Sequence, residues 1–308
     1  MKNELFRRYK GNPIFKPSDW PYPVYQVLNP AAVEYKNETV LLVRVIDRRN
    51  YSHLSLVRSK NGETDWEIDC KPTLEADLIY GEFKTGLEDP RIVWVEELQE
   101  FIIACVSFRA EYEDKPYGIE LIGTESFLTF RRISQALEPE NKNASLFPKR
   151  IKDLFALIHR PTIRGRPYIA VSFSKDLVFW GKEKPLFSTR EWGWDNNKIG
   201  LGCPPIETEK GWLLVYHGFG GKANRFIYRI GLALLDLEDL RLIRRSEEWV
   251  FGPEKDYEGG PDGIVFPCGF IVKNGELRIY YGTNDSNIGL VQANMAEVLD
   301  YVMKCPEK

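Results

Sequence analysis

The sequence predicts an all-β fold, a five-bladed β-propeller with a short C-terminal helix, in a single domain over residues 1–308. Three observations predict it: a proline-led unit that recurs five times, a pair of strand-like runs in each unit, and little helical pattern elsewhere. Five units of about 60 residues fill nearly the whole chain, and four strands per unit in radial repetition is the economical fold for that period.

A proline stands just before an apolar run in every unit. These prolines are Pro30 (LNPAAV), Pro90 (EDPRIV), Pro148 (LFPKRI), Pro205 (CPPIET) and Pro267 (VFPCGF), at intervals of 57 to 62 residues. A β-sandwich would give strands without so steady a period, and a solenoid would give a shorter one. The spacing therefore favours a propeller.

Each unit also contains two strand-like runs around a polar turn. The second runs, TVLLVRV, FIIACVSF, LFALIHR, WLLVYHG and LRIYYG, are rich in β-branched and aromatic residues, which indicates hairpins. A further polar turn followed by tryptophan recurs at residues 59–67 and 174–182, with a weaker copy at 125–133, and we expect it to join the outer strands of a blade. Residues 294–304 have apolar positions at helical spacing and predict a helix outside the final blade.

Composition narrows the function classes. The net charge of -3 leaves no basic excess for a nucleic-acid partner. No run of roughly 18 apolar residues predicts a membrane span, and the N-terminal residues lack the apolar core of a secretion signal. The five cysteines are scattered without a CxxC pair, which favours a reducing compartment. A cytoplasmic location is therefore expected.

The candidate site follows from propeller geometry. Innermost strands line a central channel, so polar residues at one mouth converge although about 60 residues separate them in the sequence. The candidates stand near the repeat prolines and at the ends of the second runs: Asn29, Arg44, Asp89, Arg91, Asn143, Arg160, Lys198, His217 and Asp285.

Asp89 is the candidate general acid. It lies in GLEDPRIV, between a glycine that permits a tight turn and a proline that fixes the next φ angle. We expect burial at the channel mouth to raise its pKa, as suits an acid catalyst. The alternative is that Asp89 caps a turn, as aspartate before proline often does.

Arg160, Lys198 and His217 form a candidate anion site. Three inward-facing positive side chains would repel one another unless an anion such as phosphate or sulfate bridges them. Each one alone is more often a surface or paired cation. Glycoside hydrolysis normally uses two carboxylates, whereas attack by phosphate needs none to activate water. One acid beside an anion site therefore predicts inverting phosphorolysis, with inorganic phosphate as co-substrate and no cofactor. Since His53, His159 and His217 are the only histidines, no multi-histidine metal site is expected, and His159 is expected to be structural.

Eight ordered motifs carry a family resemblance: LNPAAV, GLEDPRIV, NASLFPKR, LIHRPT, NNKIGLGCPPIET, GWLLVYHG, VFPCGF and IYYGTND. From about Asn12 to the C-terminal helix the chain resembles glycoside hydrolase family 130, which comprises β-mannoside phosphorylases and some hydrolases. The resemblance implies a five-bladed catalytic propeller. It implies that Asp89 is the sole acid and passes its proton through a mannose hydroxyl. It also implies roles for the other candidates: Asn143, Arg160, Lys198 and His217 on phosphate, Asn29, Arg44 and Asp285 on mannose, and Arg91 orienting the acid or the sugar.

Two departures from the family pattern bear on linkage. Lys142 precedes Asn143 where relatives acting on β-1,4 linkages often have arginine, and Glu88 stands where some relatives have tyrosine. With the short chain, both are more similar to the branch that cleaves β-1,2-mannobiose and oligomannans. Lysine lacks the fork geometry of arginine, so Lys142 is the weaker phosphate ligand.

Several alternatives stay open at this stage. They are a β-mannoside hydrolase, a β-1,4-mannoside phosphorylase and a mannoside-binding propeller without turnover. Linkage preference is expected to depend on acceptor-side loops such as residues 110–118 (AEYEDKPYG). A homo-oligomer in which a neighbouring subunit closes the acceptor side is compatible with the sequence.

Overall fold

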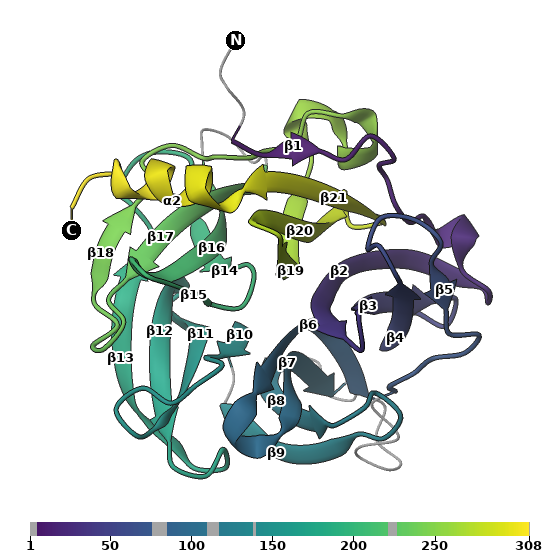
Figure 1. Ribbon diagram of the computed structural model, residues 1–308, viewed down its shortest axis with the longest axis horizontal. Coiled ribbons are helices and arrows are strands. Elements are labelled where there is room, and N and C mark those ends of the chain that lie inside the picture. Colours follow the sequence, from purple (N-terminus) through teal and green to yellow (C-terminus); the bar gives the residue numbers. More distant parts are fainter. Residues whose placement is uncertain (1–4, 76–84, 110–116, 138–139, 221–226, 308) are drawn as a thin grey trace.

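The computed structural model describes residues 5–75, 85–109, 117–137, 140–220 and 227–307, and it confirms the five-bladed β-propeller. Five antiparallel sheets stand around a central axis in sequence order (Figure 1). The innermost strands are β2 (Val24–Tyr35), β6 (Thr85–Val95), β10 (Asn141–Leu146), β14 (Lys198–Leu201) and β19 (Val265–Lys273). The second strands are β3 (Glu38–Asp47), β7 (Glu100–Arg109), β11 (Phe155–Ile163), β16 (Gly211–Phe219) and β20 (Glu276–Thr283).

The outer half of each blade follows the same order. The third strands are β4 (Ser52–Ser59), β8 (Tyr117–Thr124), β12 (Arg166–Ser174), β17 (Arg229–Leu235) and β21 (Asn287–Asn294). The outer strands are β5 (Glu67–Ile68), β9 (Arg131–Leu137), β13 (Trp180–Ser188), β18 (Leu242–Arg245) and β1 (Arg7–Arg8). In blade 4, β15 (Ile206–Thr208) also pairs with β16. The predicted turns at 59–67, 125–133 and 174–182 do join third strands to outer strands.

The short helices lie outside the sheets. The predicted C-terminal helix is confirmed as α2 (Met295–Met303), which Asn294 caps by accepting hydrogen bonds from two backbone amides. Its buried Val298 and Val302 pack into the core between blades 4 and 5. The described residues also include four 3-10 turns: η1 (Pro17–Asp19), η2 (Glu96–Leu98), η3 (Asp256–Glu258) and η4 (Gly260–Asp262). Within the described ranges, no helix combines the length and apolar character needed to cross a bilayer.

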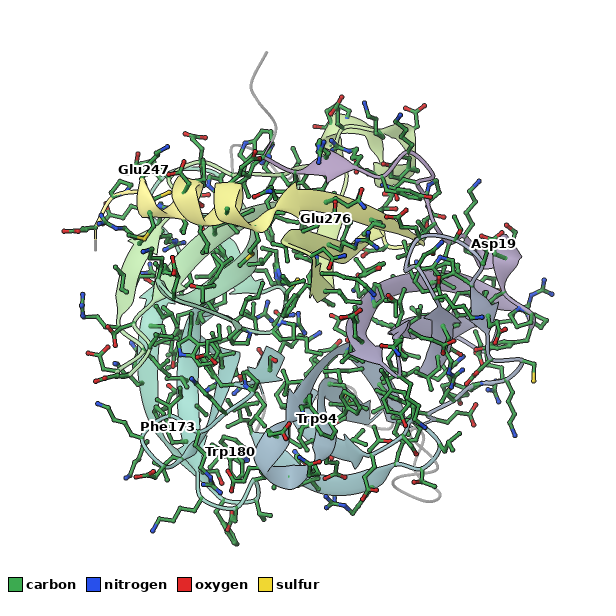
Figure 2. All side chains as sticks on the ribbon, in the orientation of Figure 1. Asp19, Trp94, Phe173, Trp180, Glu247 and Glu276 are labelled. Carbon is green, nitrogen blue, oxygen red and sulfur yellow. The ribbon has the colours of Figure 1, made fainter. Side chains whose placement is uncertain are left out.

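The hydrophobic core is divided among the five interfaces between neighbouring blades, where side chains fill the space between the sheets (Figure 2). In β16, Leu213 and Val215 face blade 5, whereas Leu214 and Tyr216 face blade 3. Both faces of the strand are therefore buried, which explains why the run WLLVY is continuously apolar. Trp180, from the recurring turn, packs on the core between blades 2 and 3 (Figure 2).

The repeat prolines are not structurally equivalent in all five blades. Pro30, Pro90 and Pro267 lie within innermost strands, but Pro148 follows β10 and Pro205 lies between β14 and β15. The expectation that each proline precedes its strand is therefore wrong. Proline is tolerated in these positions because the innermost strand is an edge strand with a free hydrogen-bonding side.

The structural equivalence lies in a β-bulge. The pairing register shifts between Leu28 and Ala31, between Glu88 and Arg91, and between Lys142 and Ser145. The residue at each bulge has a positive φ: 48° at Asn29, 50° at Asp89 and 53° at Asn143. Asparagine and aspartate tolerate this left-handed conformation best among residues with a side chain. A bulge re-aims a side chain, so the fold presents three polar groups at equivalent points of blades 1 to 3.

The N-terminal segment closes the ring, a role that the sequence patterns did not predict. Strand β1 pairs with β21 and becomes the outer strand of blade 5. Arg8 on β1 donates hydrogen bonds to both carboxylate oxygens of Glu258, at 2.9 and 3.0 Å. The Glu258 side chain is fully buried, and it also accepts a bond from the Tyr281 hydroxyl at 2.7 Å.

We predict that Arg8→Ala lowers the free energy of unfolding by about 3–5 kcal/mol, because it leaves the buried Glu258 charge without its cation. The neighbouring Arg7 is exposed, so Arg7→Ala serves as the control and should change stability by less than about 0.5 kcal/mol. Urea unfolding followed by tryptophan fluorescence measures both. Equal effects of the two substitutions would show that the Arg8–Glu258 pair does not close the ring.

Candidate active site

The predicted site residues come from all five blades and lie toward the end of the ring where innermost strands begin and second strands end. Asp89 is at the centre of their contacts. Its Oδ1 accepts a hydrogen bond from Asn29 Nδ2 at 2.8 Å and another from Arg44 Nη1 at 3.0 Å. The other end of the Arg44 guanidinium donates to Glu88 Oε1 at 2.6 Å. Three of the predicted residues are thus directly connected, across blades 1 and 2.

The pKa of Asp89 departs from the expectation. Burial alone would raise the pKa, but the Arg44 charge, the Asn29 hydrogen bond and the charges of Arg91 and Lys142 together outweigh it and lower the pKa. The prediction of a raised pKa is therefore wrong, because the carboxylate is surrounded by cations and donors rather than by apolar groups.

Arg91 is fully engaged by backbone groups. It is 1% exposed, and its guanidinium donates to the carbonyl oxygens of Gly202 at 2.5 Å, Leu201 at 2.8 Å and Asp89 at 3.0 Å. Every guanidinium nitrogen is thus engaged by backbone, which leaves no place for a sugar. Arg91 can therefore orient Asp89, as expected, but only through the Asp89 backbone carbonyl. It also joins blade 2 to blade 4.

Arg160, Lys198, His217 and Asn143 lie together on blades 3 and 4. The charges of Arg160 and Lys198 both act on His217. Asn143 Oδ1 and His217 Nε2 are also near each other, because a Cβ atom placed on Gly200 would lie 2.6 Å from each of them. Among the described residues, the buried atoms Arg160 Nε and Asn143 Oδ1 have no hydrogen-bond partner. Buried polar atoms of native proteins are nearly always paired, so this cluster is suited to a polar ligand.

His217 is not one of the cations. Its ring is fully buried, and burial, reinforced by the charges of Arg160, Arg91 and Lys198, lowers its pKa well below the usual value. The expectation of three positive side chains is therefore wrong at this position. A neutral imidazole still offers one N–H donor.

The surroundings of the two remaining cations, Arg160 and Lys198, disfavour their charged forms. Burial lowers the pKa of Arg160. Burial and the charges of Arg160 and Lys142 lower the pKa of Lys198 to about 8. No ion pair within 4.0 Å joins Arg160 or Lys198 to a carboxylate in the part of the chain that the structure describes. An anion would stabilise both charges. The Asp89 charge also acts on both, which places the acid near the anion cluster.

Two further residues complete the arrangement. Asp285, at φ 48° in the β20–β21 turn, interacts electrostatically with Asp89 and Arg44, and reduced hydration and the Asp89 charge raise its pKa. Tyr228 was missed by the sequence analysis. It lies beside Arg160, and burial raises its pKa to about 12. Its ring centroid is 5.7 Å from that of His217. Third strands begin at the same mouth where second strands end, and this topological rule could have identified Tyr228.

Other predicted features lie outside this group. His159 is structural as expected, since its ring nitrogens pair with Asn141 Oδ1 at 2.8 Å and Ser172 Oγ at 2.9 Å. Of the loop proposed for the acceptor side, residues 110–116 lie outside the described residues. No group of three or more His, Cys, Asp or Glu side chains positioned for a metal ion occurs in the described ranges. That no cofactor is needed stays a prediction.

Comparison with known proteins gives one family along the whole chain. The family model described as beta-1,4-mannooligosaccharide phosphorylase matches residues 3–304. A 1,2-beta-oligomannan phosphorylase of a Thermoanaerobacter species is 31% identical over 95% of this chain and 98% of its own length. A beta-1,4-mannooligosaccharide phosphorylase of Ruminococcus albus is 30% identical over 97% of this chain and 91% of its own.

The fold agrees with a solved relative. The structure of beta-1,2-mannobiose phosphorylase from Listeria innocua, in complex with beta-1,2-mannobiose, superposes with a TM-score of 0.85 at 27% identity, covering 97% of this chain and 99% of that one. The agreement therefore covers nearly the whole of both chains. The chain is therefore an enzyme of glycoside hydrolase family 130, the mannoside phosphorylase family.

Proposed function

We propose that this protein catalyses inverting phosphorolysis of β-1,2-linked mannobiose and manno-oligosaccharides, yielding α-mannose 1-phosphate and an acceptor shortened by one mannose. The observation that carries the proposal is the hydrogen-bonded carboxylate of Asp89 beside two buried cations, Arg160 and Lys198, that lack a carboxylate partner within 4.0 Å among the described residues. The β-1,2 linkage is favoured by the Thermoanaerobacter and Listeria relatives, whose names specify it.

In the proposed reaction, Arg160, Lys198, Asn143 and His217 hold phosphate on the face of the sugar opposite the leaving group. A phosphate oxygen attacks the anomeric carbon while the bond to the acceptor oxygen breaks. The proton of Asp89 passes through a mannose hydroxyl to that oxygen, which leaves as an alcohol. Asn29, Arg44 and Asp285 hold the transferred mannose. Tyr228, which lies beside Arg160, is a further candidate donor to phosphate.

Binding of phosphate would also explain how Asp89 can be protonated when the reaction begins. Neighbouring positive charge and the Asn29 hydrogen bond outweigh burial and lower the pKa of Asp89. Phosphate bound at Arg160 and Lys198, on both of which the Asp89 charge acts, brings negative charge near Asp89, so its binding favours the protonated acid. On this proposal the nucleophile helps to prepare the acid that assists departure of the acceptor.

The test is the dependence of product on phosphate. Purified protein with β-1,2-mannobiose and inorganic phosphate is expected to release α-mannose 1-phosphate, identified by ³¹P and ¹H NMR, and to release no mannose when phosphate is omitted. A parallel incubation with β-1,4-mannobiose tests the alternative linkage, which the Ruminococcus albus relative favours. Phosphate-independent release of mannose would instead identify a hydrolase, and binding without turnover a lectin-like propeller.

A further inference from the structure

Glu88 is a second buried carboxylate beside Asp89, and the reaction as proposed gives it no task. It is 8% exposed and directly precedes Asp89 in β6. Consecutive residues of a regular strand point to opposite faces. The bulge at Asp89 breaks this alternation, so both carboxylates reach one guanidinium: Arg44 Nη1 lies 3.0 Å from Asp89 Oδ1, and Arg44 Nη2 lies 2.6 Å from Glu88 Oε1.

The second oxygen of Glu88 faces Lys142 of the next blade. Lys142 Nζ lies 3.6 Å from Glu88 Oε2 and 3.4 Å from the centre of the Tyr117 ring. The two residues occupy matching positions, since each directly precedes a bulge residue, Asp89 in blade 2 and Asn143 in blade 3. Asn143 belongs to the anion cluster, and the Lys142 charge acts on Lys198 within that cluster. The ammonium therefore stands between the acid and the anion cluster, and Glu88 holds it on the acid's side.

We propose that Glu88 is a positioning residue that divides Arg44 between two carboxylates and retains Lys142 away from the phosphate site. This inference rests on the proposed phosphorolysis. Without Glu88, the whole Arg44 fork would be available to Asp89, and Lys142 would lose its only carboxylate contact within 4.0 Å among the described residues. Glu88 would thus set both the proton affinity of Asp89 and the number of cations that contact the bound phosphate.

Several other charges act on this pair and have to stay constant in a test. The positive groups from neighbouring elements are Arg91, Arg160 and Lys198. The other titratable groups are Asp285, Tyr117 and Tyr228, the buried thiols of Cys105 and Cys268, and neutral His217. Single substitutions at Glu88 and Lys142 retain all of them, so opposite effects of the two substitutions would report on the pair itself.

The experiment is a double-mutant cycle of Glu88→Gln and Lys142→Gln, measured as phosphate KM and as the pH dependence of kcat at saturating phosphate. Glu88→Gln should lower the phosphate KM about three- to tenfold, because Lys142 becomes free to approach the anion. It should also move the alkaline limb of kcat down by about half a pH unit to one unit, because Asp89 loses a negative neighbour. Lys142→Gln should move that limb upward.

The cycle separates a positioning role from a merely structural one. In the Lys142→Gln background, Glu88→Gln should no longer lower the phosphate KM, because the freed cation is absent. Persistence of the KM effect in that background, or unchanged KM and pH profile in the single variant, would overturn the inference. If Glu88→Gln fails to fold, the direction in which Lys142→Gln moves the alkaline limb of kcat decides. An upward shift supports the inference, and a downward or absent shift contradicts it. A wild-type protein that needs no phosphate would overturn the proposed function itself, so the two failures are distinguishable.

Discussion

Asp89→Asn is expected to reduce kcat for β-1,2-mannobiose by about 10²–10⁴-fold, the usual contribution of a positioned general acid. Asparagine keeps the shape of the side chain and an oxygen for the Asn29 and Arg44 donors, but it has no proton to deliver. Arg44 also keeps Glu88 as a partner, so the fold should persist. Steady-state release of α-mannose 1-phosphate measures the effect.

The leaving group provides the control for this prediction. An aryl β-mannoside with an acidic phenol departs without protonation, so it should lose far less rate in the Asp89→Asn variant than mannobiose does. Asp285→Asn is the matched variant, because Asp285 is the neighbouring carboxylate and is proposed to hold mannose. It should raise the mannoside KM and leave the ratio of the two substrates unchanged. Equal losses on both substrates in Asp89→Asn would contradict the acid role.

Arg160→Ala and Lys198→Ala are each expected to raise the phosphate KM by roughly one to two orders of magnitude, because each removes a charged hydrogen bond worth about 1.5–3 kcal/mol. The mannoside KM should change much less, since different residues are proposed to hold the sugar. Lys175→Ala is the matched control. Lys175 is an exposed cation on the same blade as Arg160, at the end of β12 away from the site.

A binding measurement makes this second prediction independent of turnover. Phosphate should raise the melting temperature of the wild type and of Lys175→Ala, because a ligand that binds only the folded state stabilises it. The same phosphate concentration should have little effect on Arg160→Ala. If both site variants keep the wild-type phosphate KM and thermal shift, the anion site lies elsewhere.

The sequence could predict much of this architecture because the relevant signals are local. The polar turns and the β-branched runs around them specify hairpins wherever they occur. The motifs LNPAAV, EDPRIV and VFPCGF, at spacings of 60 and 177 residues, or one and three units, specify the number of units. The topology rule that brings second-strand ends to one mouth was enough to select Arg160 and His217, and the position beside a repeat proline selected Asp89.

The strand register and the protonation states of the site residues could not be predicted from local sequence patterns. Pro148 and Pro205 fit the proline spacing but do not occupy the same structural position as the other repeat prolines. The positions that are structurally equivalent in blades 1 to 3 are the bulge residues Asn29, Asp89 and Asn143. The pKa of Asp89 and the neutrality of His217 depend on the three-dimensional sum of burial and neighbouring charges, and burial alone gave the wrong sign for Asp89.

Strand pattern and turn chemistry act over a few residues, so the chain's sequence was enough to predict a ring of five blades and the residue types at its mouth. The three-dimensional structure was needed to show that β1 closes the ring, that Arg91 pairs with backbone carbonyls, and that Glu88, Arg44 and Lys142 form one charged network. Those outcomes depend on contacts between blades, where a side chain's partner is set by bulge, twist and burial, and not by its neighbours in the chain.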